Sequence, residues 1–306
     1  MKRPLPDIPP DLRALVAEVG RRWTVNRSDN IAHMIERFTE LLRGFPMDRI
    51  AMTRDLAYGR HPRQQLDVYT PEDDRSGRAA VVFVHGGAFM DGHRDRTDGI
   101  YPNVPRYFAR NGVVGINIGY RLGRDVGYPG ATEDVASAIA WTRAHAAELG
   151  IAPDRIFLMG HSAGAAHAGS YAYDKRRQPS DGPSIAGLIV VSGRVRADNR
   201  PENPNADKVV AYYGTSDPAR LDDVSPVTHI DAESVPTFVA WGEYENPLLD
   251  VHCAELVFRL AHSKRKSPPV FWLAGHNHTS TIAHIGTSDE ALGRAILEFT
   301  AEPRSE

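Results

Sequence analysis

Apolar runs of strand length alternate with helical patterns along most of this chain. Several runs are apolar at nearly every position, which is typical of strands buried in the middle of a sheet. The segments between them carry apolar residues at the three- and four-residue spacing of helices. The sequence therefore predicts an α/β fold, with a mostly parallel central sheet and helices on both faces. The predicted strands are two short ones within DLAYG (55–59) and QQLDVYTP (64–71), followed by those within AAVVFVHGG (79–87), NGVVGINIGYRL (111–122), RIFLMGHSAG (155–164), SIAGLIVVSG (184–193), VPTFVAWGE (235–243) and PPVFWLAGH (268–276).

Two helical patterns precede the first strand signal, within residues 10–45. Their apolar residues recur three or four positions apart, and Asp29 or Asn30 is the expected N-cap of the second helix. We therefore divide the chain into residues 1–48, an N-terminal helical segment that forms part of a small cap, and residues 49–306, the main domain.

Residues 194–230 interrupt the alternation of strands and helices. The segment is rich in Pro, Asn and Asp, and its apolar periodicity is weak. We expect a surface excursion near the ligand side of the sheet that contributes to the same cap.

The composition is that of an ordinary globular protein, with 42% hydrophobic and 25% charged residues in a chain of 306. A single cysteine, Cys253, allows no internal disulfide, so nothing points to an oxidising compartment. The formal net charge of −3 gives no footprint for nucleic acid or an anionic membrane. No run approaches the roughly 18 uncharged apolar residues of a membrane span. We therefore expect a soluble, cytoplasmic protein.

The pentapeptide Gly160-His161-Ser162-Ala163-Gly164 matches the pattern G-x-S-x-G. An apolar strand precedes it and a small-residue helix follows it, which is the context of a serine on a tight strand-to-helix turn. Small residues on either side allow the strand and the helix to approach, and the turn pushes the serine oxygen above the sheet edge. The helix N-terminus favours negative charge at this point. We therefore predict that Ser162 is a nucleophile.

A second glycine-rich turn, His85-Gly86-Gly87-Ala88-Phe89, ends the first fully apolar strand. Backbone that offers its N–H groups to an oxyanion favours glycine and alanine, because larger side chains would block the approach. The turn lies about 75 residues before Ser162, and we predict that it forms an oxyanion hole.

A nucleophilic serine needs a base, and the base needs an acid to orient it. The acid and then the histidine are expected to follow the serine in the chain, each on a loop after a later strand. His276 and His278 follow the last predicted strand, and either can serve as the base. Glu243, Glu245 and Asp250 follow the strand before it and are the candidate acids.

Other residues with reactive side chains have simpler interpretations. Cys253 and the neighbouring His252 lie in an amphipathic helical pattern, where cysteine acts as a small hydrophobic residue. His276, His278 and His284 lack a carboxylate or cysteine at a supporting spacing, so we expect no metal site. We place His252 and His284 in helices or on the surface.

Together, HGGAF, GHSAG, a late acid and a late histidine resemble the α/β-hydrolase fold. Within that fold the chain is similar to carboxylesterases of the hormone-sensitive-lipase type and to kynurenine-formamidase-like and feruloyl-esterase-like enzymes. The resemblance covers residues 50–300 and includes QQLDVYTP (64–71) and IAPDRIFLMGHSAG (151–164). Ala88, in place of a third glycine, is closer to the formamidase-like and feruloyl-esterase-like branch.

The resemblance implies which acid and which histidine complete the site. In these relatives a strand ends in Gly-Glu-x-Asp, whose last residue is the triad acid. The matching stretch here runs from Gly242 to Glu245, with glutamate in place of aspartate. The resemblance therefore implies Glu245 as the acid, with Asp250 as the alternative. His278, followed by Thr279, matches the step that begins with the triad histidine.

By the same resemblance, the oxyanion donors are the backbone N–H groups of Gly87, Ala88 and Ala163. The implied function is hydrolysis of a small-molecule carboxylic ester through an acyl-enzyme, with residues 49–306 as the catalytic domain and no cofactor. An aryl-formamidase or another amidase would use the same triad. The alternative from another class is a non-catalytic ligand-binding protein on this scaffold. We expect the N-terminal helices to cover the site, to pack on a second copy in a homodimer, or both.

Overall fold

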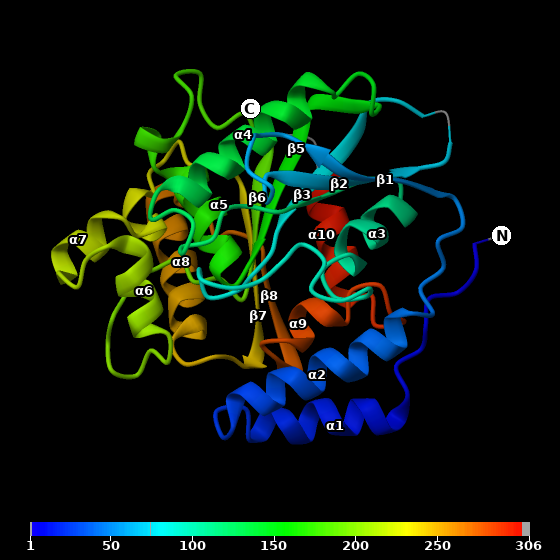
Figure 1. Cartoon of the computed structure of the whole chain (residues 1–306), viewed down its shortest axis with the longest axis horizontal. Helices are drawn as coiled ribbons and strands as arrows, with labels where there is room; N and C mark the ends of the chain where they lie inside the picture. The colour runs from blue at the N-terminus through cyan, green and yellow to red at the C-terminus, as the bar shows by residue number, and fades with distance from the viewer. Residues whose placement is uncertain (1, 74, 302–306) are drawn as a thin grey trace.

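The computed structural model describes residues 2–73 and 75–301, which form one eight-stranded sheet (Figure 1). The strands are β1 (Ile50–Ala57), β2 (Gln65–Pro71), β3 (Arg78–Val84), β4 (Val114–Ile118), β5 (Ile151–His161), β6 (Gly187–Val191), β7 (Thr237–Tyr244) and β8 (Val270–Asn277). Their order in the sheet is β1-β2-β4-β3-β5-β6-β7-β8. β2 pairs antiparallel with β1 and with β4, and every other pairing is parallel. The predicted mostly parallel sheet is thus confirmed.

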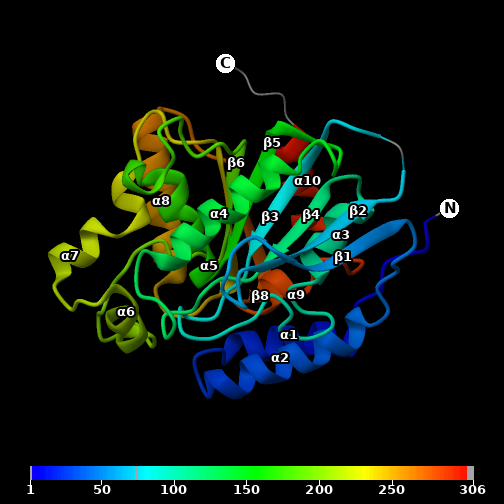
Figure 2. The ribbon, with the colours of Figure 1, turned by 45° about the horizontal axis from the view of Figure 1, so that its top comes forward.

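Helices cover both faces of the sheet (Figure 2). They are α1 (Pro10–Arg21), α2 (Arg27–Leu42), α3 (Asn103–Arg110), α4 (Gly130–Ala144), α5 (Ala163–Tyr173), α6 (Ala206–Tyr213), α7 (Pro218–Asp223), α8 (Leu249–Lys264), α9 (Ser280–Ala283) and α10 (Ala291–Ala301). Within the described residues, no helix combines the length and apolar character needed to cross a membrane.

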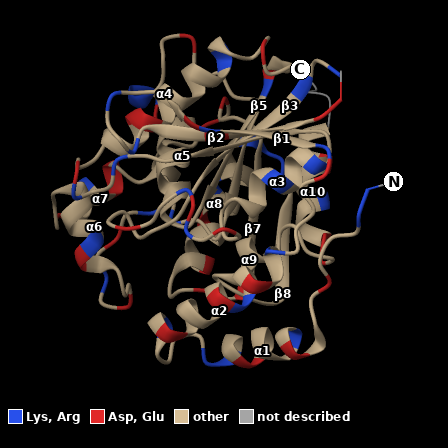
Figure 3. Ribbon diagram, turned by 45° about the vertical axis from the view of Figure 1, so that its right-hand side comes forward, with Lys and Arg blue, Asp and Glu red and all other residues tan. Residues whose placement is uncertain are grey.

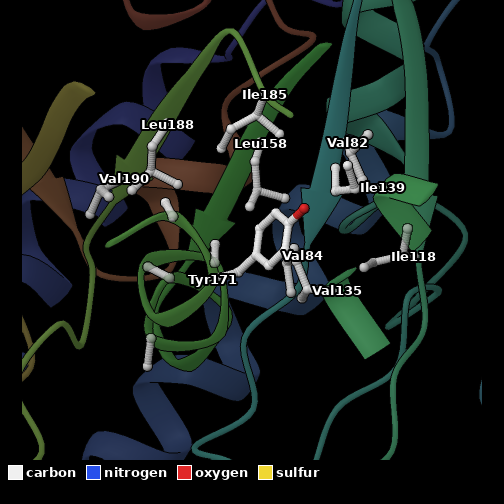
Figure 4. Close-up of a cluster of buried hydrophobic side chains, with 14 of the residues drawn as sticks. Val82, Val84, Ile118, Val135, Ile139, Leu158, Tyr171, Ile185, Leu188 and Val190 are labelled. Carbon is white, nitrogen blue, oxygen red and sulfur yellow. The ribbon is translucent and has the colours of Figure 1, made fainter. Parts of the chain in front are cut away.

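Strand β3 shows how one strand serves two cores. Val82 and Val84 join the cluster formed with α4, α5 and α8 (Figure 4), whereas Val81 and Phe83 join the cluster formed with α1, α2, α3 and α10. All residues of β3 are buried, so the sequence shows no polar alternation there. Each such Val or Phe contributes about 1.5–3 kcal/mol by its burial. The central strands are therefore packed between cores on both faces of the sheet.

Helices α1 and α2 lie side by side across the end of the sheet at which β7 and β8 finish (Figures 1 and 2). Their apolar faces belong to the same core cluster as one face of the sheet. Trp23, in the turn between the two helices, donates from Nε1 to Asn246 Oδ1 at 3.0 Å. Gly20 packs on the Tyr244 ring, where a Cβ would come within 2.3 Å of a ring carbon. The two helices are thus docked on the segment that follows β7.

The predicted N-cap of α2 is wrong. The helix begins at Arg27, so Asp29 and Asn30 both lie inside its first turn. Asn30 donates from Nδ2 to the carbonyl oxygens of Trp23 at 3.2 Å and Val25 at 2.7 Å. Its amide therefore closes the turn between the two helices, a local side-chain-to-backbone role that takes the place of the expected cap.

Candidate active site

Ser162 lies between the end of β5 and the first residue of α5. Its backbone, with φ 56° and ψ −122°, is in a region that residues with a side chain rarely adopt. Its N–H donates to the carbonyl oxygen of Val191 at 3.1 Å. Its own carbonyl oxygen accepts from the N–H groups of Ala165 at 3.1 Å and Arg194 at 3.0 Å. The surrounding backbone thus holds the strained turn that the sequence predicted.

The turn depends on the absence of a side chain at Gly164. A Cβ at this position would lie 2.2 Å from the carbonyl oxygen of Val84 and 2.5 Å from that of His85. We expect Gly164→Ala to lower the free energy of unfolding by about 3 kcal/mol or more, because backbone atoms cannot move aside cheaply. Urea unfolding measures this. Gly127→Ala, whose Cβ would meet its nearest atom at 3.4 Å, is the control; equal stability of the two variants would contradict the close packing.

His278 lies between Ser162 and Glu245. Its Nε2 is 3.1 Å from Ser162 Oγ, and its Nδ1 is 2.7 Å from Glu245 Oε2. An ionised carboxylate only accepts hydrogen bonds, so Nδ1 carries the proton and Nε2 accepts from the serine hydroxyl. The side chains of His278 and Glu245 are only 7% and 2% exposed. The structure therefore brings together the three residues of the predicted site, with His278 between Ser162 and Glu245.

Glu245 is held by donors other than His278. Its Oε1 accepts from the N–H of Gly242 at 3.0 Å and from the hydroxyl of Ser192. The Ser192 oxygen is also 3.0 Å from Thr281 Oγ1, which donates to the carbonyl oxygen of His278 at 2.8 Å. Neither Ser192 nor Thr281 is among the site residues predicted from the sequence. A signal for Ser192 is present, because it directly follows the last apolar residue of the strand β6.

The other candidate acids and the other candidate base lie elsewhere. Asp250 is exposed in the first turn of α8. Glu243 is exposed and accepts from the N–H of Gly275 at 2.8 Å. His276 has its Nε2 3.4 Å from Asp289 Oδ2. None of these three side chains therefore hydrogen-bonds to Ser162.

The loop after β3 presents unused backbone donors to the same pocket as Ser162. Gly87 and Ala88 line this pocket, and their N–H groups donate to no backbone or side-chain acceptor in the described part of the chain. The N–H of Ala163 belongs to the first turn of α5, where helical N–H groups lack an intrahelical acceptor. A Cβ on Gly87 would lie 1.8 Å from the carbonyl oxygen of Asp91. Only glycine therefore fits at position 87.

Two histidines beside the site are neutral. Burial lowers the pKa of His85 to about 3, and its ring stacks on Tyr120 while its Nδ1 lies 2.8 Å from the carbonyl oxygen of Gly86. Burial also holds the pKa of His161 well below its usual value, and its ring stacks on His278 with the centroids 5.0 Å apart. Both rings therefore support the loops of the site as uncharged groups.

A pocket of about 230 Å³ opens onto Ser162 and His278. One of its walls is a face of α2, whose lining side chains recur at helical spacing: Arg27, Ser28, Ile31 and Ile35. Asn205 and Lys208, from the excursion at residues 194–230, line it as well. Both segments that the sequence assigned to a cap thus contribute side chains to the pocket.

The remaining reactive side chains are buried away from this pocket. Burial raises the pKa of the Cys253 thiol, which fits the hydrophobic role expected of it. His252 lies in α8, as expected, and its Nε2 is 2.9 Å from Asp198 Oδ2. His284 is completely buried, so its expected helical or surface position is wrong. Among residues 2–73 and 75–301, no group of three or more His, Cys, Asp or Glu side chains is arranged to hold a metal ion.

The chain is similar to several esterases in sequence. It is 30% identical over 223 residues to the probable carboxylic ester hydrolase LipM of Mycobacterium tuberculosis. This match covers 63% of this chain and 48% of LipM. It is 29% identical over 245 residues to the esterase LipC of the same organism, covering 75% of this chain and 60% of LipC. The chain therefore spans about half the length of the curated relatives it matches.

Solved structures share its fold. A bacterial heroin esterase superposes with a TM-score of 0.72 at 22% identity, over 92% of this chain and 93% of that one. Esterase B of Lactobacillus rhamnosis superposes with a TM-score of 0.70 at 17% identity, over 94% and 93% of the two chains.

The model of the BD-FAE family matches residues 66–221, about half of the chain, and this matched segment includes both glycine-rich turns. The chain thus has the α/β-hydrolase fold and belongs to the BD-FAE family.

Proposed function

We propose that this protein is a serine carboxylic ester hydrolase that acts through an acyl-enzyme. The observation that carries the proposal is the line of hydrogen bonds from Ser162 Oγ through His278 to Glu245. Relatives named as a carboxylic ester hydrolase and as an esterase support the choice of an ester. The pocket of about 230 Å³ suits a small substrate.

In the proposed reaction, Ser162 attacks the ester carbonyl while Nε2 of His278 takes the serine proton. Glu245 keeps the proton of Nδ1 in place and stabilises the imidazolium that forms. The imidazolium then gives its proton to the leaving alcohol, and the acyl-enzyme remains. A water molecule repeats the same steps and releases the carboxylic acid.

The negative charge on the carbonyl oxygen forms in front of the unused N–H groups of Gly87, Ala88 and Ala163. Each donor of this kind contributes about 2.7–4 kcal/mol to stabilising the transition state. The N-terminal end of α5 adds a favourable dipole at the same point. None of these steps uses a metal or an organic cofactor.

Labelling with a fluorophosphonate tests the proposal directly. We expect one covalent adduct on Ser162, located by mass spectrometry of proteolytic peptides, and no adduct in Ser162→Ala. Turnover of p-nitrophenyl butyrate by the same preparations supplies the second readout. Native protein that neither labels nor turns over this ester would overturn the proposal and favour a ligand-binding protein on this scaffold.

An aryl-formamidase or another amidase would share every hydrogen bond described above. Matched phenyl esters and anilides of one acid separate the two activities, because they differ only in the leaving group. We propose that the esters are turned over faster. A higher kcat/KM for the anilides would assign the site to amide hydrolysis instead.

Three further expectations stay predictions. We propose that α1 and α2 act as part of a cap, since α2 lines the pocket. We also propose that the protein forms a homodimer, which sedimentation velocity tests. We further propose a cytoplasmic location, which fractionation of cells that express the chain tests.

A further inference from the structure

The pocket in front of Ser162 carries excess positive charge. Arg27, Arg96, Lys208 and Asp91 are the Lys, Arg, Asp and Glu side chains that line it. Lys208 Nζ lies 3.0 Å from Asp91 Oδ2, so these two charges compensate each other. Elsewhere Lys and Arg are interspersed with Asp and Glu (Figure 3), and the whole chain has a formal charge of −3. The positive pocket is therefore a local feature.

Arg27 and Arg96 have no acidic partner. Neither guanidinium takes part in an ion pair with any residue of the described chain, and Arg96 is exposed and interacts with the hydroxyl of Tyr101. Arg27 is half-buried at the start of α2, on the pocket wall formed by that helix. Two unpaired guanidinium groups on one small pocket are suited to a planar anion, which they bind with parallel hydrogen bonds.

Arg94, a buried arginine away from the pocket, is paired with carboxylates. It is 3% exposed, its Nε lies 3.2 Å from Asp67 Oδ2, and it also contacts the carboxylate of Asp55. A buried charge is normally paired in this way, because desolvation is otherwise costly. Arg27, half-buried on the pocket wall, makes no such ion pair, which leaves its N–H donors available to a ligand.

We propose that the pocket binds a carboxylate carried by the ester substrate, held by Arg27 and Arg96. This inference rests on the proposed esterase function and names its substrate class. A half-ester of a dicarboxylic acid, or an ester of a hydroxy acid, presents such a group. Arg27 and Arg96 are specificity residues in this proposal, and the bond-making residues stay as described above.

Matched pairs of substrates test the proposal. The first pair is the mono-p-nitrophenyl ester of adipic acid and the same ester of adipic acid monoamide, which differ only in carboxylate against amide. The second pair is 3-acetoxybenzoate and 3-acetoxybenzamide, which place the charge on the alcohol side. We expect the carboxylate member of at least one pair to have a kcat/KM at least about tenfold higher, mainly through KM. The ratio should fall as salt is added.

Variants connect the preference to the arginines. Arg27→Gln and Arg96→Gln should each lower the carboxylate-to-amide ratio of kcat/KM several-fold towards one. Arg43→Gln removes the same charge from the exposed C-terminal end of the same helix as Arg27, and should leave the ratio unchanged.

The outcomes separate the two proposals. Turnover of the neutral amides with no carboxylate preference in either pair would overturn the inference and leave the esterase in place. A ratio that Arg43→Gln lowers as much as Arg27→Gln would assign the effect to overall charge and overturn the inference as well. Calorimetric titration of Ser162→Ala with the two adipic esters gives a readout without turnover. Equal affinity for both there would also count against the proposal.

Discussion

The His278→Ala variant is expected to lose ester hydrolysis almost completely, with kcat falling by roughly 10⁴–10⁶-fold. Nε2 of His278 is 3.1 Å from Ser162 Oγ, so its removal leaves the hydroxyl without a base. His161 cannot replace it. The Nε2 of His161 faces the carbonyl oxygen of His278 at 3.3 Å, and burial holds its pKa well below the usual value. Steady-state kinetics on p-nitrophenyl butyrate measures the loss, with Tm as a check on folding.

The matched control is His276→Ala, two residues earlier, near the end of β8. His276 Nε2 lies 3.4 Å from Asp289 Oδ2, and the same interaction lowers the pKa of that carboxyl. Its removal is expected to lower Tm while kcat changes by no more than about twofold. If the two variants exchanged these behaviours, His276 would be the base, which the residue pattern alone had left open.

The site residues that directly follow strands could be predicted from the sequence. Ser162, Glu245 and His278 come after β5, β7 and β8, which all run parallel. The carboxyl ends of parallel strands meet at one edge of the sheet, so strand prediction alone brings these loops together. The choice of Glu245 over Asp250 needed more than strand order, because both follow β7 within a few residues.

Contacts between distant segments could not be predicted. The repeat of apolar residues in α2 indicates that one face is buried, but not that Ile31 and Ile35 face the pocket of Ser162. Arg194 begins the segment that the sequence predicts as a surface excursion, but the structure shows it only 2% exposed. Both outcomes depend on tertiary packing, which a local pattern does not contain.

The departures from local rules concentrate around Ser162. The serine itself has a positive φ, which costs about 1–3 kcal/mol. The lowered pKa of Arg194, about 10, corresponds to a cost on the order of 3 kcal/mol for keeping it charged in the fold. Together these are a sizeable part of the roughly 5–15 kcal/mol that stabilises a typical domain. The rest of the fold must offset them, which the fully buried strands on both sides of β5 are placed to do.

Glu245→Gln is expected to lower kcat by about 10⁴-fold although the two side chains have the same shape. The reason lies in which oxygen each neighbour contacts. Gly242 N–H and the Ser192 hydroxyl both donate to Oε1, so the carbonyl oxygen of a glutamine is held at that position. Its NH₂ group then faces Nδ1 of His278, where Oε2 lies 2.7 Å away in the native protein.

An NH₂ group at that position forces Nδ1 of His278 to accept a hydrogen bond. The ring proton then moves to Nε2, which no longer accepts the proton of Ser162. The loss should therefore appear in kcat with KM little changed, and Tm should stay near that of the native protein. Asp250→Asn and Glu243→Gln carry the same chemical change at exposed positions of the same region and should keep kcat within about twofold. A large loss in Asp250→Asn with an active Glu245→Gln would move the orienting acid to Asp250 and would require the loop after β7 to rearrange during the reaction.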